Sequence, residues 1–293
     1  MTIARVRREW SAGIELWLVP LVVALLPYRA GIAVARFITR VLPLYDAATE
    51  ASAAQWQRIT GGQDGDAWRA AYRLEQLVDH ADLFWSLTRR STTMLRKLHV
   101  PSLPLPAGRP LVVVSYHYGQ GFWLLHWLAT LGHPARFISM PISRDDAGSW
   151  LQYAYARLRK RQVERLSSAT LIYTGGARAA IAETLASGGA VYGLIDVPLP
   201  AAATRPGNAV MFGRPVSLPT GLIESAKAGN AAVLVLSGRL ERDGSRVVEA
   251  RLVANADALP IGDVAQELEA RVLRAPAAWH FWYLWPGFQA ANG

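Results

Sequence analysis

The chain has 293 residues, of which 52% are hydrophobic and 18% charged, a composition that excludes a disordered chain and suffices for a buried core. The absence of cysteine excludes disulfides, thiolate metal sites and a cysteine nucleophile. The net charge of +9 suits anionic lipid headgroups or an acidic carrier protein, and no nucleic-acid-binding signature is present, so nucleic acid is not an expected partner.

The N-terminal region begins with three arginines, followed by the apolar run Leu16–Tyr28. This run is shorter than the ~20 residues that span a bilayer, and two prolines interrupt it. An amphipathic pattern then continues to Val41. We interpret the segment as a monotopic anchor whose apolar side lies in the membrane interface. A signal peptide and a helix packed on the protein core are the alternatives.

A loop of glycines and polar residues at 61–65 precedes a predicted helix that Asp66 caps. Apolar residues of this helix fall on one face, namely Ala71, Leu74, Val78, Ala81 and Trp85. The proline-rich segment Pro101–Pro110 is predicted to be a linker. We therefore expect a helical, membrane-associated region over residues 1–100 and an α/β domain over residues 101–293, integrated into one fold.

Strand-like and helix-like patterns alternate after this linker. The predicted strands are Leu111–Tyr116, Ala135–Met140, Ala169–Tyr173, Ala190–Ile195, Ala231–Leu236 and Val247–Val253. The predicted helices are Gly121–Leu131, Trp150–Leu166, Arg178–Ala186, Thr220–Ala228 and Val264–Leu273. This alternation predicts an α/β fold with a central mixed sheet flanked by helices.

The candidate site begins with His117, where the chain leaves a strand and enters a helix. In open α/β sheets this carboxyl edge is where ligands bind. A histidine can take a proton from a hydroxyl and return it to a leaving group. Gly119 and Gly121 allow the backbone to approach a substrate, and their N–H groups could stabilise an oxyanion. The alternative interpretation of His117 is a hydrogen-bonded turn residue.

Other catalytic motifs are incomplete or absent. Gly119 and Gly121 start a dinucleotide fingerprint, but Leu124 stands where the third glycine belongs. No G-x-S-x-G elbow and no H-E-x-x-H motif occurs in the sequence. We therefore expect no nucleotide cofactor and no metal site.

Asp196 ends the predicted strand Ala190–Ile195 at the same sheet edge, so its carboxylate could approach His117. A turn residue before Pro198 is the alternative interpretation of this aspartate. Further on, Gly213 and Pro215 suit a tight turn, and Thr220 suits a helix N-cap.

Taken in order, these features resemble the late acyltransferases of lipid A biosynthesis (the lauroyl/myristoyl type), within the lysophospholipid acyltransferase superfamily. The resemblance covers nearly the whole chain, and its most specific part is Met211–Gly221 (MFGRPVSLPTG). The aromatic segment that begins Trp279-His280-Phe281 resembles the C-terminal stretch of that family. One departure stands out: the family carries a carboxylate five residues after the histidine, and Phe122 occupies that position here.

The resemblance implies transfer of a fatty acyl group from a carrier thioester to a hydroxyl of a membrane lipid or glycolipid, at the cytoplasmic face of a bacterial inner membrane. It implies His117 as the general base, and Asp196 is the candidate to replace the missing acid. Arg178 and Arg214 would bind phosphate or phosphopantetheine. The basic stretch Arg157–Arg161 would dock an acyl carrier protein or anionic lipid, and acyl-coenzyme A is the other candidate donor. A non-enzymatic lipid- or carrier-binding protein, or an acyltransferase for an unusual acceptor, are the alternatives that Phe122 leaves open.

Overall fold

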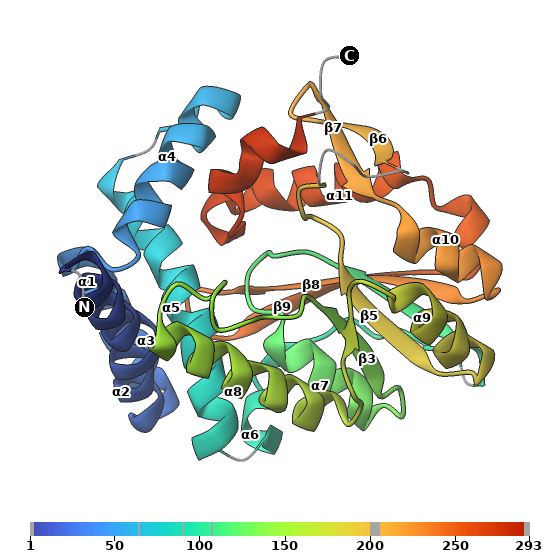
Figure 1. The fold of residues 1–293 in the computed structure, drawn as a ribbon, viewed down its shortest axis with the longest axis horizontal. Helices are drawn as coiled ribbons and strands as arrows, with labels where there is room; N and C mark the ends of the chain where they lie inside the picture. The colour runs from blue at the N-terminus through green and yellow to red at the C-terminus, as the bar shows by residue number, and fades with distance from the viewer. Residues whose placement is uncertain (1–2, 64, 90, 107, 200–205, 290–293) are drawn as a thin grey trace.

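A computed structural model of the chain describes residues 3–63, 65–89, 91–106, 108–199 and 206–289. It shows an α/β fold in which a mixed seven-stranded sheet is flanked by helices, as the sequence predicts (Figure 1). The strand order is β1-β9-β8-β2-β5-β3-β4, and all neighbours are parallel except β8 and β9. The strands are β1 (Leu98–His99), β2 (Leu111–Ser115), β3 (Ala135–Ser139), β4 (Ile172–Tyr173), β5 (Ala190–Leu194), β8 (Ala232–Leu240) and β9 (Arg246–Val253).

The central strand β2 is buried on both sides, because successive side chains of a strand point to opposite faces. Leu111 and Val113 belong to one apolar core, and Val112 and Val114 belong to the other. The first core also contains residues of α2 (Val19–Leu25), α3 (Tyr28–Val41), α5 (Asp66–Thr88), α6 (Ser91–Leu95), α7 (Phe122–Thr130) and α8 (Trp150–Ser167). The second contains residues of α4 (Asp46–Thr60), α9 (Ala177–Ala186), α10 (Gly221–Ala228), α11 (Ile261–Arg274) and the 3₁₀ segments η2 (Ala256–Ala258), η3 (Pro276–Ala278) and η4 (Trp282–Phe288).

The N-terminal helices are part of this fold. α1 (Ile3–Ala12), the π-helical η1 (Gly13–Leu18) and α2 follow one another without a break, and α3 begins after Pro27. Buried residues on their inner side, such as Val23 and Ile32, share a core with β2. The strand β1, just before the predicted boundary at residue 100, pairs with β9 of the main sheet. Among the described helices, none combines the length and apolar character that crossing a membrane requires.

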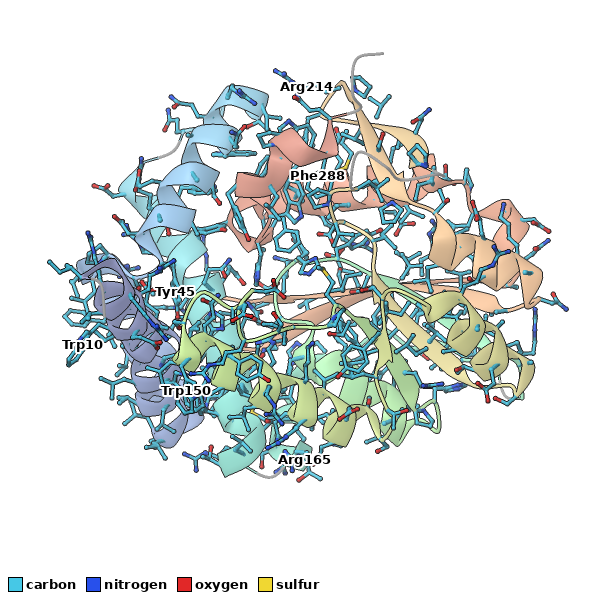
Figure 2. The ribbon with its side chains drawn as sticks, in the orientation of Figure 1. Trp10, Tyr45, Trp150, Arg165, Arg214 and Phe288 are labelled. Carbon is cyan, nitrogen blue, oxygen red and sulfur yellow. The ribbon has the colours of Figure 1, made fainter. Side chains whose placement is uncertain are left out.

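The outer side of the same helices carries large apolar side chains. Trp10 is 69% exposed and Phe37 is 65% exposed (Figure 2 shows Trp10 at the molecular edge). The exposed apolar residues of this region recur at helical spacing and are Ile3, Trp10, Ile14, Leu18, Val22, Leu25, Phe37, Val41 and Leu42. We call these nine residues the N-terminal apolar face. The amphipathic character predicted for this region is therefore present, with one side in the core and one side outside it.

Some local predictions need correction. Asp66 is the first residue of α5 rather than its cap, and Gly65 holds the N-cap position. The segment around Gly213 is a turn, as predicted. It connects the two strands of a hairpin, β6 (Pro206–Met211) and β7 (Arg214–Pro219), and neither strand was predicted. This hairpin alternates buried and exposed residues over only six positions per strand, a weak signal. Residues 64 and 107, within the two predicted loops, lie outside the described residues.

Candidate active site

His117 and Asp196 meet at the carboxyl edge of the sheet. They follow β2 and β5, which are adjacent and parallel, so the two residues leave the sheet side by side. The imidazole Nδ1 of His117 lies 3.0 Å from Oδ1 of Asp196, which is hydrogen-bond distance. This confirms the contact predicted between the two side chains.

The carboxylate of Asp196 is fully buried, and hydrogen-bond donors hold it in place. The backbone N–H of His117 donates to both oxygens at 2.9 and 2.8 Å. The indole Nε1 of Trp279 donates to Oδ2 at 2.9 Å. A carboxylate bonded to Nδ1 fixes the orientation of an imidazole and leaves Nε2 for a substrate.

The segment Trp279–Phe281 supports the site with three successive residues. Besides the bond from Trp279 to Asp196, the backbone N–H of His280 donates to the carbonyl of His117 at 2.9 Å. The ring of Phe281 stacks on the imidazole of His117, with centroids 3.8 Å apart and planes 22° apart. This C-terminal segment therefore restrains both the backbone and the ring of the histidine.

The loop between His117 and α7 is held by backbone hydrogen bonds. The N–H of Gly119 donates to the carbonyl of Ala278 at 2.8 Å, and the N–H of Gln120 donates to Gly238 at 3.0 Å. The Gly119 N–H therefore already has a partner, which leaves the other N–H groups near Gly119 and Gly121, or an arginine, as the predicted oxyanion donors. Gly121 is the N-cap of α7 and lines the cavity described below, so the first turn of α7, whose N–H groups have no partner within the helix, begins at this cavity.

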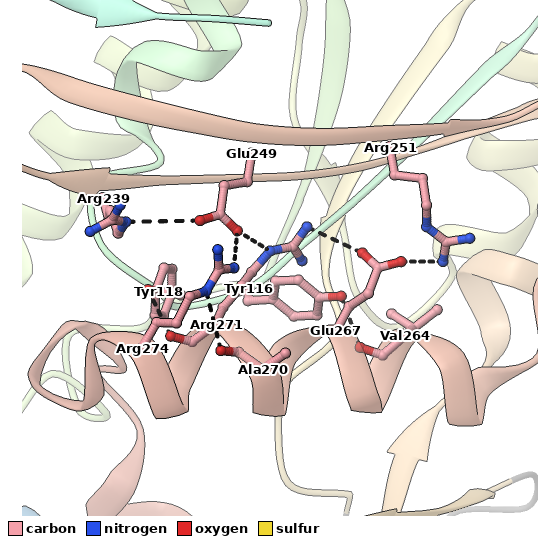
Figure 3. Close-up of polar contacts among 10 residues, drawn as sticks. All are labelled: Tyr116, Tyr118, Arg239, Glu249, Arg251, Val264, Glu267, Ala270, Arg271 and Arg274. Atoms are coloured by element: carbon pink, nitrogen blue, oxygen red, sulfur yellow. Dashed lines mark hydrogen bonds and ion pairs between the residues drawn. The ribbon is translucent and has the colours of Figure 1, made fainter.

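Two tyrosines flank His117 and fasten the loop to α11. The hydroxyl of Tyr116 donates to the carbonyl of Val264 at 2.9 Å, and the hydroxyl of Tyr118 donates to the backbone carbonyl of Arg271 at 3.0 Å. The helix is in turn tied to β8 and β9 by a network of acidic and basic side chains (Figure 3). The network consists of Arg239, Glu249, Arg251, Glu267, Arg271 and Arg274.

His117 lines a cavity of about 300 Å³ whose wall combines apolar and polar side chains. The apolar lining residues include Phe122, Leu125, Phe137, Val163, Leu171, Tyr192 and Leu194. The polar and charged lining residues include Asp79, His117, Ser139, Arg159, Lys160 and His280. An apolar wall with a few convergent polar groups is the usual composition of a small-molecule site.

Arg159 is a cation of this cavity that an acidic residue holds in place. Its guanidinium donates to Oδ1 of Asp79 at 2.9 Å and to the hydroxyl of Tyr155 at 3.3 Å. Burial alone would raise the pKa of the Asp79 carboxyl, but the neighbouring guanidinium outweighs burial and lowers it to about 2. Within the predicted docking stretch, Arg159 and Lys160 thus line the cavity, whereas Arg157 and Arg161 are exposed.

Phe122, which stands where the late acyltransferases that the sequence resembles carry an acid, lines the cavity. Its ring lies under the guanidinium of Arg159, 5.2 Å from ring centroid to guanidinium carbon. The side chain therefore contributes an apolar wall and a cation–π contact. The acid that contacts the imidazole comes instead from the end of β5.

The structure does not bring all predicted binding residues to this cavity. Gly119 and Gly121 line it, but Arg178 and Arg214 do not. Arg178 is exposed on the first turn of α9, and Arg214 lies on the β6–β7 hairpin, at the upper edge of the molecule in Figure 2. Motif position alone placed these arginines at the site, and the fold separates them from it. No cluster of metal-ligating side chains is found within the described ranges.

Sequence reasoning missed five residues of the site. They are Asp79, Arg159 as a cavity residue, Trp279, His280 and Phe281. A histidine inside a run of aromatic residues was the available signal for the last three. No family model and no curated protein matches the chain, so the resemblance to the late acyltransferases stays a prediction.

Proposed function

We propose that the protein transfers a fatty acyl group from a carrier thioester to a hydroxyl of a lipid or glycolipid at a membrane surface. One observation carries this proposal: His117, whose Nδ1 is hydrogen-bonded to Asp196, lines a cavity whose wall combines apolar side chains with the cations Arg159 and Lys160. A fatty acyl thioester needs the same combination, an apolar wall for the chain and polar groups at the reacting carbonyl.

In the proposed reaction, Nε2 of His117 takes the proton of the acceptor hydroxyl, and the oxygen attacks the thioester carbonyl carbon. The carbonyl becomes an oxyanion. Collapse of this intermediate breaks the carbon–sulfur bond, and the sulfur takes the proton from His117 and leaves as a free thiol. The buried carboxylate of Asp196 orients the ring throughout.

Two sources of oxyanion stabilisation face the cavity. The guanidinium of Arg159 is held in place by Asp79 and supplies a fixed positive charge. Backbone N–H groups at the first turn of α7, where Gly121 and Phe122 line the cavity, are the second source. Fixed donors aimed at a developing charge usually give the largest single contribution to such catalysis.

The surroundings support a membrane acceptor and a charged donor. The N-terminal apolar face is flanked by the exposed arginines Arg5, Arg7 and Arg8, a combination that suits the interface of an anionic membrane. On α8, the exposed Arg157 and Arg161 lie one helical turn apart and suit an acidic carrier protein. Acyl carrier protein and acyl-coenzyme A are both candidate donors.

Acyl transfer is tested with the purified full-length chain, a bacterial lipid extract as acceptor, and acyl carrier protein or coenzyme A thioesters as separate donors. Mass spectrometry should show an acylated lipid and release of free thiol. His117→Ala should lower the rate at least ~100-fold, the effect of removing a general base. Its melting temperature should stay within a few degrees of the wild-type value. Transfer from neither donor, or a folded His117→Ala protein that keeps its activity, would contradict the proposal.

A further inference from the structure

His280 lines the same cavity as His117 but has no role in the steps above. Its ring nitrogens make no hydrogen bond to any residue that the structure describes, and Nε2 is buried without a partner. Buried polar side-chain atoms are generally hydrogen-bonded, and those that are not often have a functional reason. A histidine that lines the cavity beside a candidate base, with hydrogen-bonding capacity that no described residue uses, suggests contact with a ligand.

The position of His280 is fixed by its backbone rather than by its ring. The N–H donates to the carbonyl of His117 at 2.9 Å, and the carbonyl accepts the hydroxyl of Tyr72 at 2.8 Å. Its neighbours Trp279 and Phe281 are held by Asp196 and by the His117 ring. The backbone therefore holds the ring in the cavity wall without the help of a side-chain hydrogen bond.

The chemical state of the ring limits what it could bind. Burial lowers the pKa of His280 to about 4, although the nearby Asp79 opposes this, so the imidazole is neutral at pH 7. A neutral imidazole donates one hydrogen bond and accepts another, as a hydroxyl does. The cationic Arg159 already serves the carbonyl oxygen, on which negative charge develops. A neutral hydroxyl of the acceptor is thus the better match for His280.

We propose that His280 binds a second hydroxyl of the acceptor, adjacent to the one that His117 deprotonates, so that the preferred acceptor carries a vicinal diol, as in a glycerol or sugar headgroup. This inference rests on the proposed acyl transfer. His280 would act as an acceptor-binding residue, and no proton would leave or reach it during the reaction.

The test compares acceptors that differ by one hydroxyl. A 1-monoacylglycerol carries two adjacent hydroxyls, and the 1-acyl esters of 1,2-propanediol and 1,3-propanediol carry one each. The wild type should use the monoacylglycerol with a kcat/KM at least about tenfold higher than either ester, since an unpaired buried partner disfavours the deoxy substrates. His280→Ala should lose this preference mainly through a higher KM for the diol, with little change for the single-hydroxyl esters. His280→Gln, which keeps a donor and an acceptor, should restore part of it.

His126→Gln is the matched control, because His126 is a partly buried histidine whose Nδ1 contacts the carbonyl of Leu166 and which does not line the cavity. It should leave the preference unchanged. An equal loss with all three acceptors in His280→Ala, or a wild type without diol preference, would overturn the inference. If the wild type acylates none of the acceptors tested, the proposed function fails instead, and NMR of the His280 ring decides the binding question. A chemical-shift change with monoacylglycerol micelles that the deoxy esters do not produce supports the site, and identical spectra overturn it.

Discussion

At the scale of single residues, the hydrogen-bond donors around Asp196 require a carboxylate at this position. Two N–H groups of His117 and one of Trp279 point at its two oxygens, and all are neutral when the ring is neutral. An asparagine has nearly the same shape, but its amide group would turn N–H toward one of these N–H donors. The acid is therefore specified by hydrogen-bond direction as well as by its charge.

Asp196→Asn should accordingly lower acyl transfer at least ~100-fold, because the imidazole loses the partner that orients it and stabilises its charged form. It should also lower the free energy of unfolding by about 1–3 kcal/mol, the effect of leaving a buried donor unpaired. Urea unfolding and steady-state rates measure both effects. Asp46→Asn is the control, since Asp46 is exposed and forms an ion pair with Arg73 of a kind worth under about 1 kcal/mol. Activity of Asp196→Asn within a few-fold of wild type would contradict this role.

Phe122→Glu should not raise the activity, because the imidazole already has an acid. The new carboxylate would lie beside the Arg159 guanidinium, which now contacts the Phe122 ring, and would draw this cation away from the carbonyl oxygen. We expect an unchanged or lower rate in the same assay. A gain in activity would show that Asp196 does not serve as the acid that the proposed mechanism needs.

The burial of His280 also predicts how the free energy of unfolding depends on pH. Its pKa in the folded protein is about 4, below the usual value of 6.5, because burial disfavours the charged ring. The contribution of His280 to the free energy of unfolding is therefore fully present above pH 6.5 and is lost as the pH falls toward 4. Between pH 7.5 and pH 5.0 the loss should be about 2 kcal/mol.

The measurement compares urea unfolding of wild type and His280→Gln at both pH values. The variant should show a decrease on acidification that is about 2 kcal/mol smaller. Other buried groups cancel in this difference, including Glu75 and Asp82, for which burial raises the pKa to about 7 and about 6 and which act with the opposite sign. Equal decreases in the two proteins would refute the buried, neutral state of His280.

At the scale of elements, the loop from β2 to α7 is the part of the site where we expect a substitution to be tolerated least. Gly119 has a φ of +60°, and a Cβ built there would lie 2.0 Å from the carbonyl oxygen of Gly238. The loop therefore needs glycine for two independent reasons, backbone conformation and close approach to β8. Both constraints arise from the hydrogen bonds that hold the loop against Ala278 and Gly238.

Gly119→Ala should lower the free energy of unfolding by about 2–4 kcal/mol and abolish activity, because β8 cannot move away from the new methyl group without breaking the loop contacts. Gly121→Ala is the matched control two residues on: the nearest atom to its Cβ would be the hydroxyl of Tyr192 at 3.8 Å, an ordinary contact. It should cost less than about 1 kcal/mol. Thermal unfolding of both variants measures the difference, and equal effects would contradict the close-approach argument.

At the scale of the whole molecule, the N-terminal apolar face and the sheet-edge site belong to one body. The inner side of α2 and α3 shares a core with the sheet, so the exposed side is carried at a fixed place on the fold (Figure 1). Removing this segment would expose the core, and point substitutions on the outer side are the cleaner test of membrane contact.

We expect the full-length protein to sediment with anionic lipid vesicles. The double variant Leu18→Asp/Phe37→Asp should lower vesicle binding at least about tenfold, since both side chains are more than half exposed and would bury apolar area in the interface. Val210→Asp is the control, an exposed apolar residue on the β6–β7 hairpin, away from α1–α3 in Figure 1. An unchanged affinity of the double variant, or a wild type that stays in the supernatant, would refute the membrane role of this face.

The sequence by itself determined the alternation of strands and helices and the positions of His117 and Asp196 at strand ends. These follow from local patterns, the period of apolar residues and the glycines after β2. Parallel strands end at one edge, so two strand-end side chains were expected to be near each other whenever their strands were neighbours. The hairpin β6–β7 and the N-cap of α5 were not predicted correctly because their local sequence patterns are short.

Only the tertiary structure decided which strands are neighbours and which distant segments complete the site. β5 lies beside β2, although β3 and β4 come between them in the chain. Trp279–Phe281 reaches His117 from about 160 residues away by pairing with the backbone after β2. On α8, Arg159 lines the cavity and Arg157 is exposed because the fold packs one side of this helix against α7 and β3. Such contacts join residues far apart in the chain, so no local pattern of apolar residues or charges encodes them.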